Sequence, residues 1–232
     1  MISSFYHEIF YRPLVNLLVF FYQGIPYHDL GLAIILVTVL IRILLYPLMT
    51  KSLKSQKEMA DIQPQLRVIQ EKYKNNKEEQ AKRVMEFYKE KGVNPFSGCL
   101  PILIQLPLLF ALYQVFAGAA NGQLLREIYS FVPRPDALSP IGFGFLDLSH
   151  RSIVLAVVAG ISQFLQAYLM PKPVKSLGPE NAMQNAIQNQ TTFVLPIIIT
   201  IISFNFPAAL PLYWIVLNII GIIQQEVIKR KK

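Results

Sequence analysis

Five long apolar runs limit what this chain can fold into more than any other feature of its sequence. They cover residues 29–50, 99–118, 152–170, 191–206 and 209–228. A helix needs about 20 apolar residues to cross the hydrocarbon core of a bilayer, whereas soluble domains alternate apolar and polar residues with the period of their helices or strands. The sequence therefore predicts an all-α, polytopic membrane protein with five transmembrane helices. The fourth run is short, so we expect it to tilt little or the bilayer to thin around it.

The segments between the runs differ in positive charge. Seventeen of the 22 Lys and Arg residues lie at 51–98, 171–190 and 229–232. The four in the other connecting segments are Arg12, Arg126, Arg134 and Arg151. Five crossings place the three basic segments on one side, and cytoplasmic segments of membrane proteins carry the excess of Lys and Arg. We therefore expect the N-terminus outside the cell, an extracytoplasmic loop at 119–151 and the C-terminus in the cytoplasm.

Composition removes several classes of site. Cys99 is the only cysteine of the 232-residue chain, which excludes an internal disulfide and a cysteine metal cluster. The sequence contains no GxxxxGK[ST] phosphate-binding loop, and we predict no nucleotide, metal or other cofactor and no direct readout of nucleic acid. The N-terminus lacks the basic segment, apolar core and small-residue cleavage site of a signal peptide, so we do not expect it to be cleaved.

Residues 1–28 form a separate N-terminal segment. Their apolar run, Leu14–Tyr22, is too short to cross a bilayer. Its aromatic residues suit a helix that lies in the membrane interface, with Arg12 on the aqueous side. We therefore expect an interfacial amphipathic helix before the first span.

Arg42 lies inside the first apolar run, about 13 Å along a helix from Lys51. A charge near the centre of a spanning helix costs roughly 2.5–3.5 kcal/mol and usually has a partner. None of the 14 Asp and Glu residues lies in the interior of a run, and Glu226, near the end of the fifth, comes closest. Two interpretations remain. Either Arg42 extends towards the lipid headgroups, or it lies in a water-filled cavity where its charge can attract an acidic group.

Other polar residues recur inside the runs. They are Thr38 and Tyr46 beside Arg42 in the first run, Gln105 in the second, Ser162, Gln163 and Gln166 in the third, and Trp214, Asn218, Gly221 and Gln225 in the fifth. Spacings of three and four residues place those of the first and fifth runs on single helix faces. Each residue alone is as compatible with hydrogen bonding between helices of an ordinary bundle. Together with an unpaired arginine, they favour a shared hydrophilic groove.

Residues 51–98 are strongly charged but carry two apolar faces. The first face consists of Met59, Ile62, Leu66, Ile69 and Tyr73, and the second of Ala81, Val84, Met85 and Tyr88. The first has the spacing of a coiled-coil seam, KNNK at 74–77 predicts a turn between them, and Gly92 is a candidate C-cap. We expect an antiparallel helical hairpin in the cytoplasm. It is either merely solvated or a docking surface for anionic lipid and phosphate-rich partners.

Four motifs carry a resemblance to a known family. They are GLAIILVTVLIRILLYPL, MADIQPQLRVIQEKY, NPFSGCLPILIQLPLLFALYQVF and LPLYWIVLNIIGIIQQ. In their order and spacing the chain resembles the YidC/Oxa/Alb membrane protein insertases over residues 10–228, in the form of a bacterial member without the large periplasmic domain. The resemblance implies a five-span core around a hydrophilic groove that is open to the cytoplasm and the lipid and closed to the outside.

The resemblance also implies which residues line this groove. It makes Arg42 the key groove residue and adds Gln105, Trp214 and, less specifically, Gln163 or Gln166. With the other polar residues of the runs, the predicted substrate-binding set is Arg42, Thr38, Gln105, Ser162, Gln163, Gln166, Trp214 and Asn218.

The implied function is that of an insertase without covalent chemistry. Nascent membrane proteins would be captured in the groove and their spans released into the lipid bilayer of the bacterial inner membrane, the cell membrane. The Sec translocon, the signal recognition machinery and the ribosome are further candidate partners. A small transporter or channel is the main alternative, but the spans contain no internal acids and no two matching broken helices. A scaffold for membrane-protein assembly is the second alternative.

Overall fold

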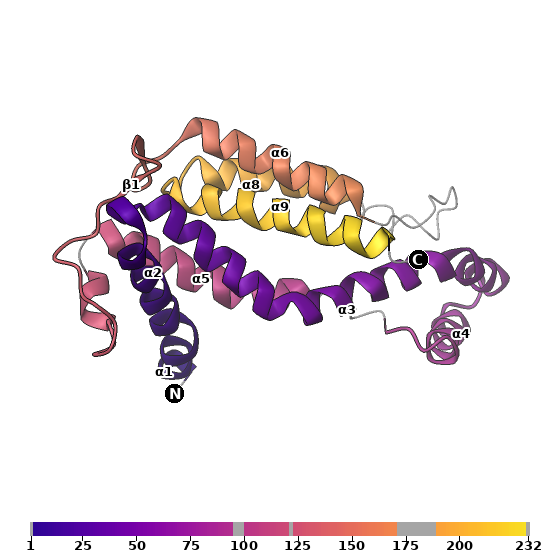
Figure 1. Cartoon of the computed structure of the whole chain (residues 1–232). Coiled ribbons are helices and arrows are strands. Elements are labelled where there is room, and N and C mark those ends of the chain that lie inside the picture. Colours follow the sequence, from indigo (N-terminus) through magenta and orange to yellow (C-terminus); the bar gives the residue numbers. More distant parts are fainter. Residues whose placement is uncertain (1, 95–99, 121–122, 171–188, 231–232) are drawn as a thin grey trace.

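The computed structural model describes residues 2–94, 100–120, 123–170 and 189–230. Within them the chain is almost entirely helical (Figure 1). Most of the predicted cytoplasmic loop at 171–190 lies outside the described residues, and so do Lys231 and Lys232 of the predicted basic tail.

Two of the described helices are long and apolar enough to cross a membrane, Leu30–Lys72 and Ala209–Ile228. Shorter apolar helices occupy Leu103–Gly118, Ile153–Leu169 and Gln190–Ser203. Large apolar side chains remain exposed on the outer faces of the helices, among them Ile153, Ile161, Ile197 and Ile223. An apolar exterior of this kind fits lipid better than water. The structure thus agrees with a helical membrane protein.

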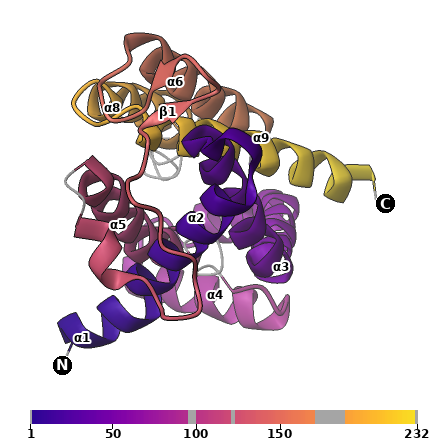
Figure 2. The same ribbon diagram turned by 60° about the vertical axis from the view of Figure 1, so that its left-hand side comes forward.

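The N-terminal segment consists of α1 (Ile2–Tyr6), the π-helical η1 (His7–Tyr11), α2 (Arg12–Gly24) and the short η2 (Pro26–His28). Its apolar residues do not form a face separate from the protein. They are buried in the main core, as Leu14, Val15, Leu18, Val19 and Tyr22. Figure 2 shows α2 lying between α5 and α3. The location of this segment in a membrane interface stays a prediction.

α3 (Leu30–Lys72) begins where the Asp29 carboxylate accepts a hydrogen bond from the backbone N–H of Leu32 at 2.8 Å. The helix continues through Pro47 and Pro64. The predicted boundary at residue 50, between the first span and the hairpin, is therefore not a break in the chain. A proline removes one backbone hydrogen bond but does not have to end a helix that neighbouring elements support. The first span and the first arm of the hairpin form one curved helix (Figure 1).

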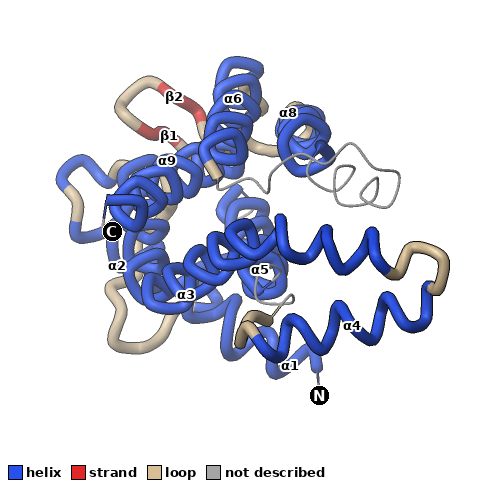
Figure 3. The backbone as a smooth tube through the Cα atoms, turned by 90° about the vertical axis from the view of Figure 1, so that its right-hand side faces the viewer, coloured by secondary structure: helices blue, strands red, loops and turns tan. Residues whose placement is uncertain are grey.

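α4 (Lys77–Glu90) returns beside the second half of α3 (Figure 3). The turn predicted at 74–77 and the C-cap predicted at Gly92 are confirmed, because α4 starts after Asn76 and Gly92 adopts a φ of +65°. The hairpin core contains Leu66, Phe87 and Tyr88, with Met59, Ile62, Ile69 and Val84 around them. The prediction is wrong for Ala81, which is exposed, and for Met85, which is 47% exposed, and Phe87 is buried in their place. A helix rotated slightly about its axis presents a neighbouring residue to its partner.

α5 (Leu100–Ala120) is followed by a short 3-10 turn, η4 (Gln123–Glu127), and by a loop with one small β-hairpin. Its strands, β1 (Ile141–Gly142) and β2 (Leu146–Asp147), are antiparallel, with Ile141 opposite Asp147. The strands are the one departure from the all-α prediction among the described residues.

α6 (Ile153–Leu169) begins at Ser152, whose hydroxyl accepts from the backbone N–H of Leu155 at 3.3 Å. The fourth run forms η6 (Gln190–Val194) and α8 (Leu195–Ser203), and the fifth forms α9 (Ala209–Arg230). α6, α8 and α9 lie side by side, and α9 also packs along α3 (Figures 1 and 3). α5 makes far fewer contacts with α3 and α9 than they make with each other. The bundle is therefore least tightly packed around α5.

Candidate functional site

Arg42 is half-buried on α3 and reaches α9. Its Nη2 donates to the backbone carbonyl of Leu217 at 3.2 Å, and its Nε is buried without a hydrogen-bond partner among the residues that the structure describes. The ion pairs between described residues do not include Arg42. Within the described part of the chain, no carboxylate neutralises this positive charge.

The residues one turn before and after Arg42 have different surroundings. Thr38 is 1% exposed, and its hydroxyl donates to the carbonyl of Ile34 in the same helix at 2.7 Å. Tyr46 is an exposed side chain. The predicted stripe on α3 is therefore not one uniform polar face. Thr38 is satisfied within its own helix, which is a common use of threonine in a spanning helix.

Gln105 and Tyr213 connect α5 to α9. The side-chain amide of Gln105 donates to the hydroxyl of Tyr213, a side chain that is almost fully buried. The Tyr213 hydroxyl also lies within electrostatic range of the Arg42 guanidinium. Leu217 follows Tyr213 by one helical turn, so both lie on the same side of α9. Arg42, Gln105 and Tyr213 are called the Arg42 cluster below. It takes one residue from each of α3, α5 and α9.

Asn218 and Ser162 belong to a second polar contact, between α9 and α6. The Asn218 amide donates to the Ser162 hydroxyl at 2.9 Å, and that hydroxyl donates to the carbonyl of Ala159 at 2.8 Å. Both side chains are buried. Their interaction is of the kind that joins helices in an ordinary bundle, the alternative left open by the sequence. The amide oxygen of Asn218 is buried without a partner.

The remaining predicted residues lie beside this second contact or in the core. Gln166 of α6 lies over Gly221 of α9, where a Cβ would collide with its amide group. Gln163 follows Ser162 and is half-buried, and Trp214 is part of the apolar core. Of the eight predicted groove residues, the structure therefore brings Arg42 and Gln105 together through Tyr213. It places Ser162, Gln166 and Asn218 at the α6–α9 contact.

A further polar tie between α3 and α9 lies towards the hairpin. The Gln224 amide donates to the Thr50 hydroxyl at 2.9 Å and to the Tyr46 carbonyl at 3.3 Å. The neighbouring Gln225 is also buried, and its amide oxygen lacks a partner. Hydrogen bonds therefore join α3 and α9 at two positions along the helices, from Arg42 to the Leu217 carbonyl and from Gln224 to Thr50.

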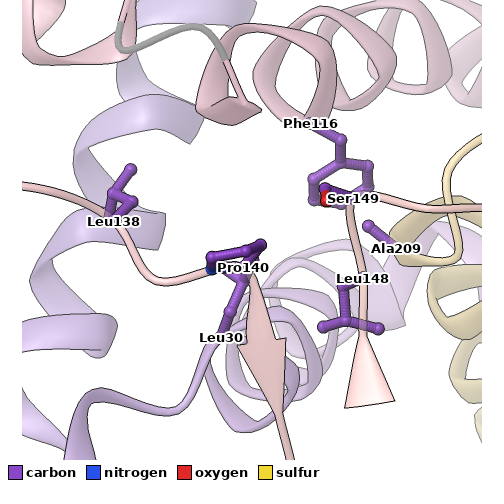
Figure 4. Close-up of a pocket in the computed structure, with 7 residues that line it drawn as sticks. All are labelled: Leu30, Phe116, Leu138, Pro140, Leu148, Ser149 and Ala209. Atoms are coloured by element: carbon purple, nitrogen blue, oxygen red, sulfur yellow. The ribbon is translucent and has the colours of Figure 1, made fainter.

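At the end of the bundle that carries β1 and β2, the helices meet around a small apolar cavity of about 130 Å³ (Figure 4). Its lining residues are Leu30, Phe116, Leu138, Pro140, Leu148, Ser149 and Ala209. The loop is held to the start of α9 by backbone hydrogen bonds, from Ala209 to Leu148 at 3.1 Å and from Ala208 to His150 at 2.8 Å. The loop thus lies against the start of α9 and contributes to the lining of this cavity.

The Arg42 cluster offers a positive charge and hydrogen-bonding groups but no nucleophile. The described residues contain no group of three or more His, Cys, Asp or Glu that could hold a metal ion. The positive charge and the hydrogen-bonding groups of the Arg42 cluster can recognise a polar or negatively charged group.

Comparison with known proteins places the chain in a family. Residues 20–232 match the model of the family described as 60Kd inner membrane protein. The chain belongs to this family. Its resemblance to the YidC/Oxa/Alb proteins is thereby confirmed.

Several relatives of the chain carry the name membrane protein insertase YidC. The protein of Syntrophobacter fumaroxidans is 38% identical over 223 residues, which cover 94% of the chain and 37% of the relative. The proteins of Geobacter metallireducens (34% identity; 94% and 36% covered) and Francisella philomiragia (40% identity; 86% and 32% covered) are similar. The chain thus spans roughly a third of the length of these relatives.

The sequence patterns did not single out Tyr213. The signal was present: a phenol in an apolar run, one residue before Trp214 and one turn before Leu217. Its partners lie 108 and more residues away in the sequence. Local spacing therefore could not distinguish Tyr213 from an interfacial or core tyrosine.

Proposed function

We propose that this chain is a membrane protein insertase. It receives a nascent membrane protein in a hydrophilic groove at the Arg42 cluster and releases the apolar segment of that protein into the bilayer. Five spans, formed by α3, α5, α6, η6 with α8, and α9, surround the groove. The protein lies in the bacterial inner membrane with its N-terminus outside and its C-terminus in the cytoplasm, and it acts without covalent chemistry.

The uncompensated charge of Arg42 is the observation that carries this proposal. A guanidinium in a spanning helix is costly unless water or a counter-charge reaches it. Its described hydrogen bond goes to a neutral carbonyl, that of Leu217. A wet groove that admits an acidic segment of a substrate explains both the charge and the lack of a carboxylate partner among the described residues.

The mechanism shortens the dry path of a polar tail across the membrane. Each unsatisfied polar group costs several kcal/mol in lipid. A groove that extends halfway into the bilayer removes part of this cost, and Arg42 attracts the tail electrostatically. The transmembrane segment of the substrate then passes α6 and α9, which expose Leu165 and Ile223. Burial of that segment in lipid drives its release.

The packing of the bundle supports a groove with one closed end. At the β1–β2 end, the loop joins the start of α9 and surrounds an apolar cavity. α5 packs far less against α3 and α9 than these two helices pack against each other. A groove beside α5 would then be open to the cytoplasm and closed to the outside. It would include Arg42, Gln105 and, at the α6–α9 wall, Ser162, Gln163, Gln166 and Asn218, with Thr38 and Trp214 behind it.

The α3–α4 hairpin is the proposed docking surface. It packs mainly on itself, through Leu66, Phe87 and Tyr88. Its basic residues would attract anionic lipid and phosphate-rich partners. We propose nascent membrane proteins as the substrates. The Sec translocon, the signal recognition machinery and the ribosome are candidates for partners that deliver them.

The proposal is tested by reconstitution. The purified chain alone in liposomes should insert a single-span protein with an acidic N-terminal tail, measured by protease protection of the tail. Added salt should slow capture, because a groove open to the cytoplasm is partly screened. Empty liposomes are the control. Equal insertion without the protein, or insertion that ignores both the acids of the tail and Arg42→Ala, would refute it.

The same liposomes distinguish the alternatives. A transporter or channel would pass solutes and would be indifferent to the charge of a peptide tail. An assembly scaffold would bind membrane proteins that are already inserted but would not increase protease protection.

A further inference from the structure

α5 is attached to the rest of the protein mainly through the N-terminal segment. It packs more extensively against η1 than against α3 or α9. Yet α3 and α9 carry the other two members of the Arg42 cluster. The position of Gln105 relative to Arg42 therefore depends on how α5 is held at its other end, near η4.

Asn16 is the polar centre of that attachment. Its side chain is 5% exposed, and its amide nitrogen donates to the carbonyls of Arg12 at 2.7 Å and Glu127 at 3.0 Å. Its amide oxygen accepts from the backbone N–H of Tyr129 at 2.6 Å. Both donors and the acceptor of a buried amide are therefore used. Two of the three bonds join α2 to the segment that follows α5.

Other contacts surround Asn16 but are more exposed. The Arg12 guanidinium lies 4.7 Å from the centre of the Tyr129 ring, and His7 Nε2 lies 3.3 Å from Glu127 Oε2. The Tyr6 hydroxyl donates to the side chain of Gln114 on α5 at 3.3 Å. Solvent-exposed pairs contribute little to fixing a structure. The buried amide of Asn16 is thus the strongest polar link between α2 and the end of α5.

We propose that Asn16 is a positioning residue that holds this end of α5 as a pivot and so sets the separation of Gln105 from Arg42. Gly118, which lies against Leu124, follows Gln105 by 13 residues, or about 20 Å along the helix. A tilt of about 10° at the pivot would move Gln105 by roughly 3 Å. That movement exceeds the tolerance of a hydrogen bond, so the bond to Tyr213 would break. The Gln105–Tyr213 bond, called the latch below, thus holds α5 close to α9 beside the groove.

The inference rests on the proposed function. It adds what sets the width of the groove. Its test uses spin-label distances. The reporting pair is Leu103→Cys on α5 with Ile223→Cys on α9, two exposed positions, in a Cys99→Ser background. Asn16→Ala should shift the mean of this distance by about 3 Å or broaden its distribution. Tyr213→Phe, which removes the latch alone, should broaden it.

A second label pair separates positioning from general loosening. Leu44→Cys on α3 and Ile161→Cys on α6 are exposed and do not involve α5. Their distance should be the same in the wild-type and Asn16→Ala proteins. The matched control is Asn205→Ala, since the Asn205 amide donates to Ile201 four residues earlier at 3.0 Å. It should leave both distances unchanged.

If Asn16→Ala does not fold, Asn16→Asp takes its place, because it keeps the size and the acceptor oxygen but cannot donate. An unchanged 103–223 distance, or equal broadening of both pairs, would overturn the inference. The distances require no substrate. Loss of insertion by the wild-type protein would therefore count against the proposed function and not against the pivot.

Discussion

Arg42 on α3 and Leu217 on α9 are joined by a hydrogen bond of 3.2 Å from the guanidinium Nη2 to the backbone carbonyl. The carbonyl is a neutral acceptor, so this bond orients the guanidinium without cancelling its charge. The remaining N–H groups can serve another acceptor, and Nε has no partner in the described part of the chain. The relationship separates two roles of Arg42, its charge and its planar geometry, which substitution can distinguish.

Arg42→Lys should retain most of the insertion activity, because an ammonium group preserves the charge. Arg42→Ala should slow insertion of substrates with acidic tails by about tenfold. Two charges about 4 Å apart attract by roughly 1–4 kcal/mol in a wet site, before desolvation, and about 1.4 kcal/mol corresponds to a factor of ten. Initial rates in liposomes measure this. A lysine variant as inactive as alanine would show that the planar guanidinium is required.

Asn218→Ala should destabilise the α6–α9 contact by about 0.6 kcal/mol, and by no more than roughly 1.7, the range known for such bonds between spanning helices. The reason is the loss of the 2.9 Å bond to Ser162. Thermal unfolding in detergent measures the change, with the exposed Asn205→Ala as the matched control. If the unfolding temperature falls no more than in the control, the bond does not stabilise the contact between the helices.

Gly160→Ala should be more destabilising than Gly221→Ala, although both glycines contact a polar side chain of another helix. At Gly160 the new Cβ meets Thr200, a β-branched residue whose hydroxyl is bound to the carbonyl of Pro196 at 2.8 Å. At Gly221 it meets the flexible end of Gln166. Overpacking costs about 1–3 kcal/mol where neighbours cannot move. Unfolding temperatures of the two variants decide the order, and the reverse order would contradict it.

Shortening the hairpin around residues 74–77, by equal lengths of α3 and α4, should leave a folded protein that inserts substrates several-fold more slowly. The hairpin core of Leu66, Phe87 and Tyr88 is separate from the main core. Loss of its tip should therefore not disturb the bundle. Helical content, unfolding temperature and insertion rate are the measurements. Aggregation of the shortened protein would show that the tip is needed for folding.

Ser149→Ala should reduce the stability that the ionised Asp147 carboxylate gives the 141–150 loop, and with it the pH dependence of that stability. The Ser149 hydroxyl and N–H donate to the Asp147 carboxylate at 2.6 and 2.9 Å and lower the pKa of Asp147 to about 2. An unfolded Asp titrates near a pKa of about 3.9, so the ionised carboxylate stabilises the fold above that pH, and this contribution is lost as pH falls towards 2. Without the Ser149 hydroxyl the pKa of folded Asp147 should rise towards its unfolded value, so both the stabilisation above that pH and its loss in acid should be smaller. The effect is small because Asp147 is largely exposed. Carboxyl-carbon NMR titration measures it, and an unchanged pKa would contradict it.

Local patterns in the sequence were enough to predict a helical membrane protein and its helical hairpin. The length of an apolar run indicates a helix buried in lipid. The spacing of Leu66, Tyr88 and their neighbours indicates the apolar face of each hairpin helix. The turn at 74–77 and the left-handed Gly92 are likewise properties of a few adjacent residues. Each of these features can be read from a continuous stretch of the sequence.

The tertiary structure alone decided which polar residues meet. The sequence did not indicate which of the eight predicted groove residues contact one another. In the structure, Ser162 and Asn218 pair between α6 and α9, while Gln105 reaches Tyr213 beside Arg42. It also decided that Asn16, inside an apolar run, would join α2 to the end of α5. The spacing of residues sets the face of a helix on which a side chain lies, but the rotation and tilt of each helix against its neighbours set its partner. Those angles depend on packing between residues far apart in the chain, 56 positions for Ser162 and Asn218 and 108 for Gln105 and Tyr213.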